Sequence, residues 1–131
     1  MLMQTKDLML AYLQDNGFRP EEQEYGLVFR YEGANFLYFN NEDDNAFFQL
    51  TMPGIYEIND GNRQAVYAAM NAANAMAKVV KLVDINGAVW VTFEILVDST
   101  PELGDIVPRA LAMLQNGRNE FAKALMQQGQ N

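Results

Sequence analysis

Three consecutive carboxylates form a conspicuous cluster of ionisable side chains. Glu42, Asp43 and Asp44 lie in the stretch NNEDDNAFFQL, residues 40–50, between asparagines and a pair of phenylalanines. A calcium loop of the EF-hand type needs glycine at its sixth position and glutamate at its twelfth, but counting from Asn41 gives alanine and methionine there. We therefore expect no metal site, and we interpret the cluster as a turn between two strands, since Asn and Asp favour turns.

A second group of polar side chains could hold an anion. Asn74 and Lys78 are four residues apart on one face of a predicted helix, and Lys81 follows on the next predicted strand. A sensor or regulator that binds a small anionic ligand at these three residues is therefore one hypothesis. We favour a structural role, because lysines near a helix C-terminus offset the helix dipole and Asn74 can hydrogen-bond to a neighbouring backbone edge.

Glu94 is an acidic residue within a strongly apolar predicted strand. With Glu57 it could serve a carboxylate-based hydrolase, which needs one neutral and one ionised carboxyl group at a set distance. Nothing in the sequence spaces the two residues for that reaction. A two-residue turn at 86–87 would instead bring Glu94 close to Lys81, so we expect an ion pair across this hairpin.

The composition removes most catalytic chemistry. The chain contains no cysteine and no histidine, which excludes thiolate nucleophiles, imidazole bases and zinc sites built on nitrogen or sulfur. Nine basic residues against 17 acidic ones give a net charge of −8, which repels a phosphate backbone. We therefore predict a protein that is not an enzyme, uses no cofactor and binds no nucleic acid.

No segment has the pattern of a membrane anchor or a secretion signal. The longest apolar runs fall well short of the roughly 20 residues that a membrane-spanning helix needs. Lys6 and Asp7 precede the first apolar stretch, and this stretch has the periodicity of an amphipathic helix rather than of a signal peptide. We expect a cytoplasmic protein with no membrane partner and a single domain over residues 1–131.

The pattern of apolar and turn-forming residues predicts eight elements. Helical periodicity and capping residues indicate helices over 5–16, 61–78 and 102–127, and short apolar runs indicate strands over 27–31, 35–39, 46–52, 79–85 and 88–97. The order α-β-β-β-α-β-β-α predicts an α+β domain with one antiparallel five-stranded sheet and helices mainly on one side. In the last helix, Pro108 and the Asn116-Gly117 pair predict a kink or a late start near Asp105.

The strand over 88–97 has two different faces. One face alternates through Val89, Val91, Phe93, Ile95 and Val97 and must enter the core, whereas the other carries Ala88, Trp90, Thr92, Glu94 and Leu96. Phe47 and Phe48 must point to opposite sides of their own strand. We predict that a segment of another protein binds through the second sheet face, beside an open strand edge, or through the first helix, with Trp90, Leu96, Glu94 and Phe48 as the candidate contacts.

Several of these stretches together resemble the YbjN-type domain, also called the bacterial sensory transduction regulator family. The resemblance covers "LQDNGFRP", "LVFRYEGANFLYFNNEDDNAFFQLTMPGIYEI" and "AANAMAKVVKLVDINGAVWVTFEILVD". Asp44 matches an Asp of the family's hairpin loop, and Asn74, Lys78 and Lys81 match its Asn and two lysines. The chain differs in having Asn45 where a proline often follows, and in Pro108.

The resemblance implies a fold like that of the type III secretion chaperones. It also implies a domain without enzymatic activity that forms homodimers and binds segments of other proteins. We therefore expect a chaperone-like or regulatory interaction domain. The sensor for a small anionic ligand remains the alternative.

Overall fold

The structure is a computed structural model that describes residues 4–41 and 43–129. The elements in chain order are α1 (Thr5–Asp15), β1 (Glu21–Gln23), β2 (Gly26–Tyr31), β3 (Ala34–Phe39), β4 (Phe47–Glu57), α2 (Arg63–Met76), β5 (Val80–Ile85), β6 (Ala88–Leu96) and α3 (Leu103–Gly129). All strand pairs are antiparallel, in the order β1-β2-β3-β4-β6-β5. The predicted α+β class is confirmed, but the prediction of five strands is wrong because the sheet has six.

The additional strand is β1, which lies between the predicted helix over 5–16 and the predicted strand over 27–31. All three of its residues are exposed, so no alternation of buried and exposed side chains marks it as a strand. Its backbone pairs with β2, with Glu22 opposite Leu27. A short acidic strand at a sheet edge also discourages pairing with other chains.

Strand β4 is longer than predicted. The prediction ends it before Pro53, yet β4 continues to Glu57 through a register shift between Met52 and Tyr56. Gly54 has a φ of 55°, and glycine accepts this left-handed conformation without a steric penalty. The irregularity lets β4 keep pairing with β6 on both sides of the proline.

The helices differ from the prediction at their ends. α2 covers Arg63–Met76 rather than 61–78, because residues 60–62 form a turn and the chain reverses towards β5 at Val79, whose φ is 73°. α3 is one helix that includes Pro108. The expected late start near Asp105 is not observed, because α3 begins at Leu103 and continues through Pro108 and Asn116-Gly117 without a break. Pro108 lies in the second turn of the helix, where it removes one backbone hydrogen bond.

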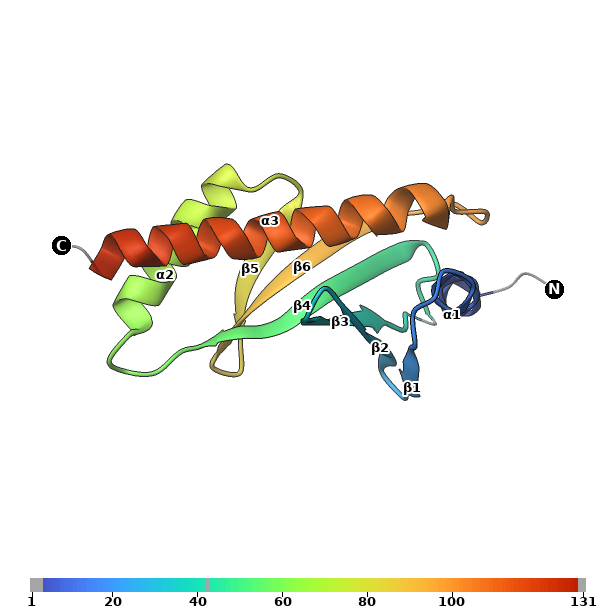
Figure 1. The fold of residues 1–131 in the computed structure, drawn as a ribbon, viewed down its shortest axis with the longest axis horizontal. Helices are drawn as coiled ribbons and strands as arrows, with labels where there is room; N and C mark the ends of the chain where they lie inside the picture. The colour runs from blue at the N-terminus through green and yellow to red at the C-terminus, as the bar shows by residue number, and fades with distance from the viewer. Residues whose placement is uncertain (1–3, 42, 130–131) are drawn as a thin grey trace.

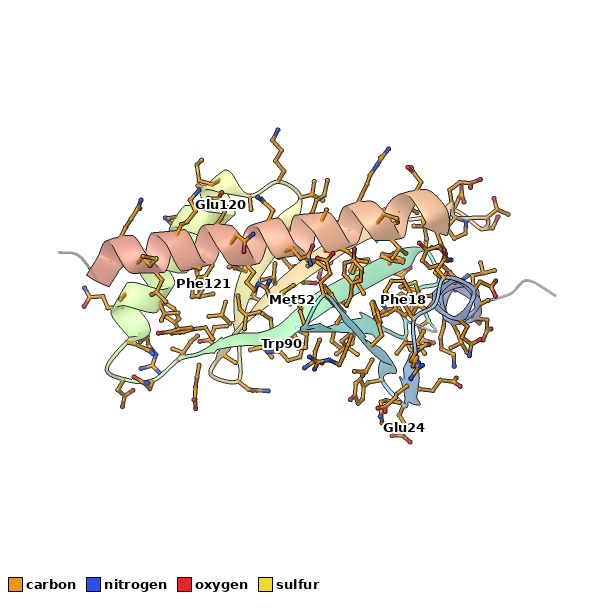
Figure 2. The ribbon with its side chains drawn as sticks, in the orientation of Figure 1. Phe18, Glu24, Met52, Trp90, Glu120 and Phe121 are labelled. Atoms are coloured by element: carbon orange, nitrogen blue, oxygen red, sulfur yellow. The ribbon has the colours of Figure 1, made fainter. Side chains whose placement is uncertain are left out.

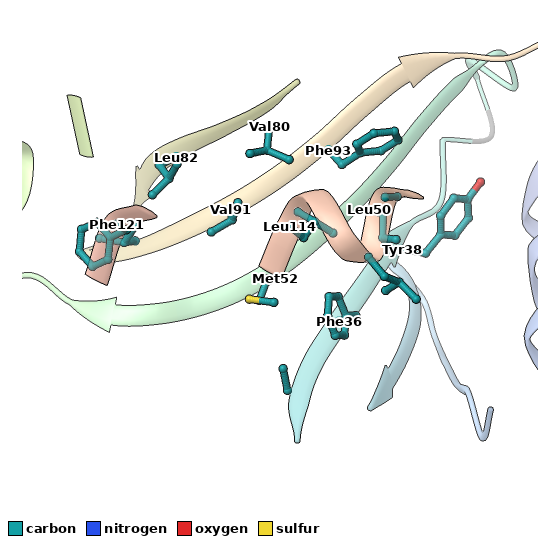
Figure 3. Close-up of a cluster of buried hydrophobic side chains, with 14 of the residues drawn as sticks. Phe36, Tyr38, Leu50, Met52, Val80, Leu82, Val91, Phe93, Leu114 and Phe121 are labelled. Atoms are coloured by element: carbon teal, nitrogen blue, oxygen red, sulfur yellow. The ribbon is translucent and has the colours of Figure 1, made fainter. Parts of the chain in front are cut away.

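The sheet has one side covered by helices and one side that we call the open face. α3 crosses the sheet along its length, α2 lies beside the C-terminal half of α3, and α1 lies at the opposite end of the sheet (Figure 1). The core lies between α3 and the strands and includes Leu50, Val91 and Leu114 (Figure 3). The core position predicted for Val89, Val91 and Phe93 is confirmed, because all three are buried.

Tyr38 is buried in this core, and burial raises the pKa of its phenol to about 12. In the unfolded chain the pKa returns to about 10, so the unfolded state loses its proton first as the pH rises. We expect Tyr38 to favour the folded state below about pH 10 and to lose this contribution progressively between about pH 10 and pH 12. Denaturant melts over this range should show a shallower decline for Tyr38→Phe than for the native sequence, and equal slopes would contradict the prediction.

Candidate functional site

The open face is the side of the sheet opposite α2 and α3. The position of Gly117 in α3, against Val80 and Val91, fixes which side carries the helices. Alternation along the strands then places a different set of side chains on the open face. From the observed strand registers, these are Val28, Arg30, Asn35, Leu37, Phe39, Phe47, Gln49, Thr51, Glu57, Lys81, Val83, Ile85, Ala88, Trp90, Thr92, Glu94 and Leu96. Trp90 lies on the side of the sheet away from α3, whereas Phe121 lies close beneath that helix (Figure 2).

A chain of polar side chains crosses the open face from β5 to β4. Lys81 Nζ lies 2.8 Å from Glu94 Oε1, which confirms the ion pair predicted across the hairpin. Gln49 Nε2 donates to Glu94 Oε2 at 3.0 Å, so both carboxylate oxygens have a partner. Because Lys81 remains more than half exposed, this pair contributes under about 1 kcal/mol to folding, and its main effect is to fix the Glu94 side chain.

Two aromatic rings lie beside this polar chain. The rings of Phe39 and Trp90 stack with centroids 6.4 Å apart and an angle of 21° between their planes. Thr51 lies on β4, the strand between β3 and β6, and its Oγ1 is 3.1 Å from Thr92 Oγ1 on β6. The two threonines are only 1 % and 4 % exposed. The centre of the open face is therefore closed and ordered although neither α2 nor α3 covers it.

Among the described residues, the most exposed large apolar side chain of the open face lies at the end of β6. Leu96 is 78 % exposed and pairs with Phe47 on β4. Phe48, the next residue, is fully buried and packs against Phe93 and Tyr38 on the helix side. The prediction that Phe48 contributes to a binding surface is therefore wrong, and Phe47 is the member of the pair on the open face. Sequence alternation alone gives opposite faces for the two rings but not which face each one takes.

The structure does not bring the three residues of the predicted anion site together. Asn74 Oδ1 accepts a hydrogen bond from the Leu82 backbone N–H at 2.7 Å, and Asn74 Nδ2 donates to the Leu82 carbonyl at 3.2 Å. Lys81 is bound to Glu94 on the open face, and Lys78 lies exposed in the connection between α2 and β5. Asn74 thus has the predicted structural role, since it occupies the outer edge of β5 at Leu82.

The loop between β3 and β4 anchors the first helix. Asn45 Oδ1 accepts a hydrogen bond from the Thr5 backbone N–H at 2.6 Å, and Thr5 Oγ1 donates to the Asn45 carbonyl at 2.7 Å. No local sequence signal reveals this link, because the two residues are 40 positions apart. The Phe47 N–H donates to the Asp44 carbonyl, as in a turn. Glu42 lies outside the described residues.

Neither a metal centre nor a membrane-spanning helix is found in residues 4–41 and 43–129. These residues contain no group of three or more Asp or Glu side chains placed to hold a metal ion. Among the same residues, no helix combines the length and the apolar character needed to cross a bilayer.

Comparison with solved structures identifies the fold. No family model and no curated protein matches this sequence. The crystal structure of YbjN, a candidate transcription regulator from E. coli, superposes with a TM-score of 0.65 over 93 % of this chain and 92 % of that chain, at 14 % identity. An uncharacterised protein from Methanothermobacter thermautotrophicus gives a TM-score of 0.54 over 96 % of this chain and 97 % of that chain, at 10 % identity. The similarity to type III secretion chaperones remains a prediction. The chain has the fold of a YbjN-type domain.

Proposed function

We propose that this protein is a non-enzymatic regulatory domain that binds a segment of another protein through its open face and acts as a homodimer. One observation carries the proposal: Leu96 is 78 % exposed on a sheet face that α2 and α3 leave uncovered. Full burial of a leucine side chain is worth about 1.5–3 kcal/mol, so a partner that covers Leu96 would gain substantial free energy.

The surroundings of Leu96 support a protein partner. Phe47 and the half-buried Trp90 supply rigid aromatic surface, and such residues often dominate binding energy at protein interfaces. Gln49 and Glu94 are already ordered by their mutual hydrogen bond, so little side-chain entropy is lost when they meet a partner. An apolar anchor beside an ordered polar group is a common arrangement in specific interfaces.

The composition supports regulation by contact with proteins. The absence of cysteine and histidine removes the common catalytic groups, which is why we propose a domain without enzymatic activity. YbjN from E. coli is described as a candidate transcription regulator. The net charge of −8 makes direct contact with DNA unfavourable for this chain, so an effect on transcription would pass through a protein partner.

The Leu96→Glu variant tests the binding surface. We expect it to lose at least about tenfold in affinity for its protein partner, since a buried carboxylate would replace an apolar contact. Its free energy of unfolding should stay within about 0.5 kcal/mol of the native value, because the side chain is exposed. The measurement is capture of partners from lysate followed by titration of the purified partner.

Met126→Glu is the matched control, because Met126 is 67 % exposed on α3, away from the open face. It should retain all captured partners. If Leu96→Glu and the native protein capture the same proteins with the same affinity, the open face is not the binding site. Light scattering tests the homodimer separately, and a mass equal to one chain of 14.8 kDa would contradict it.

A further inference from the structure

A cavity of about 670 Å³ opens beside the edge of β2. It arises because β1 is short: the pairing of β1 with β2 stops at Val28, while β2 continues to Tyr31. The connection at 16–20 passes beside this uncovered part of β2 and forms the other wall. Cavities of about 300–1,000 Å³ are typical of small-molecule sites.

One wall of the cavity is aromatic. Phe18 packs edge-on against Phe29 with ring centroids 5.4 Å apart, and it also contacts Tyr31 with centroids 5.7 Å apart. Gly17, with a φ of 86°, turns the chain out of α1 so that Phe18 meets these rings. Phe18 lies beside α1, at the end of the molecule opposite Phe121 (Figure 2). These contacts hold the wall rigid.

The cavity is also lined by two arginines, Arg19 and Arg30. Arg30 is held by two neutral oxygens: Nη1 donates to Asn35 Oδ1 at 3.0 Å and Nη2 donates to the Gly33 carbonyl at 3.2 Å. Within residues 4–41 and 43–129, neither arginine forms an ion pair. The Arg30 guanidinium is therefore oriented, while its charge and its remaining N–H donors are available to a ligand.

Two acidic residues balance the charge of the two arginines. Glu21 and Glu32 line the same cavity, so its two cationic and two anionic side chains sum to 2 − 2 = 0. Glu32 Oε2 accepts a hydrogen bond from Gln115 Nε2 of α3 at 2.9 Å, which holds that carboxylate towards the helix side. The total charge of the cavity therefore gives no preference between a monoanion and a dianion, and the planar carboxylate is favoured by its match to the guanidinium geometry.

We propose that this cavity binds an organic monocarboxylate with an apolar or aromatic body. Successive residues of β2 point to opposite faces of the sheet, so the cavity wraps around this edge, with Arg30 on its open-face side and Phe18 and Tyr31 on its helix side. The carboxylate would lie against Arg19 and Arg30, because the planar guanidinium matches its geometry, and the body would extend around the edge of β2 towards Phe18 and Tyr31. The site uses none of Trp90, Glu94 or Leu96, so it is independent of the proposed function.

The test uses benzoate as the probe and records amide chemical shifts by NMR during titration of the full chain. We expect saturable shifts confined to residues 16–21 and 28–35. Benzamide and inorganic phosphate should bind at least about tenfold more weakly, because benzamide is planar but uncharged and phosphate is charged but not planar. Arg19→Ala and Arg30→Gln should each weaken benzoate binding about tenfold. Both side chains are exposed, so these variants should fold normally.

Lys78→Ala is the matched control, since it removes an exposed cation elsewhere and should leave benzoate binding unchanged. The proposal is overturned if benzoate gives no saturable shifts in these two segments. It is also overturned if benzamide binds as well as benzoate, or if the double variant Arg19→Ala with Arg30→Gln binds benzoate as the native protein does.

Discussion

Replacing Phe48 with alanine is expected to lower the free energy of unfolding by about 3–5 kcal/mol. Phe48 is 0 % exposed and meets Phe93 edge-on with ring centroids 6.2 Å apart, while Tyr38 lies at 5.3 Å. Truncation removes the buried ring and leaves a cavity, because the neighbouring rings lie on separate strands that pair at a fixed register. The loss therefore combines the transfer free energy of the ring with the cost of the cavity.

Phe47→Ala is the matched control, one residue away on the same strand. Phe47 is only partly buried and lies on the open face, so we expect a loss of under about 1.5 kcal/mol. Urea denaturation followed by Trp90 fluorescence measures both variants. Equal losses for Phe47→Ala and Phe48→Ala would contradict the assignment of the two faces. If the proposed function is correct, Phe47→Ala should also weaken partner binding in a protein that remains folded.

The features that local sequence determines were predictable. The Asn86-Gly87 pair has φ values of 52° and 84°, as a tight hairpin turn requires, and the alternation of Val89, Val91 and Phe93 gave the core face of β6 correctly. The pairing of Lys81 with Glu94 followed from the position of that turn. Each of these predictions depends on residues that are close together in the sequence.

The features that depend on distant pairing were not predictable. β1 has no apolar pattern, and only its pairing with β2 makes it a strand. The burial of Phe48 depends on the register of β4 against β6, which are separated in the sequence by α2 and β5. The cavity beside β2 exists only because β1 ends early. A single sequence carries no signal for such gaps between elements, so it did not indicate that Arg19 and Arg30 line one cavity.

The predicted anion site failed because residues that are close in the sequence are separated in the fold. Asn74, Lys78 and Lys81 are close in sequence, but β5 turns its successive side chains to opposite faces of the sheet. Asn74, near the end of α2, bonds to the backbone of Leu82 at the edge of β5. Lys81 points to the open face, where it pairs with Glu94. Sequence proximity indicated a shared site that the geometry of the strand does not allow.

Introducing a side chain at position 117 is expected to disrupt the packing of α3 on the sheet. A Cβ atom at Gly117 would lie 2.9 Å from Val80 Cγ2 and 3.0 Å from Val91 Cγ1. Both valines are buried, and valine has few alternative rotamers, so neither methyl group can move away easily. In Gly117→Ala the clash opposes a gain of about 1 kcal/mol in helix propensity. In Gly117→Leu three further carbon atoms enter the same closed space.

We therefore expect Gly117→Leu to lower the free energy of unfolding by at least about 3 kcal/mol, and Gly117→Ala to lower it by at most about 2 kcal/mol. Gly104→Ala is the control in the same helix, because a Cβ there meets no atom within 4 Å; it should leave stability unchanged or raise it by up to about 1 kcal/mol. Urea denaturation of the three variants gives the comparison. If Gly117→Leu is as stable as Gly104→Ala, α3 does not approach β5 and β6 as closely as the structure shows, and the side of the sheet opposite α3 could not be identified as the open face.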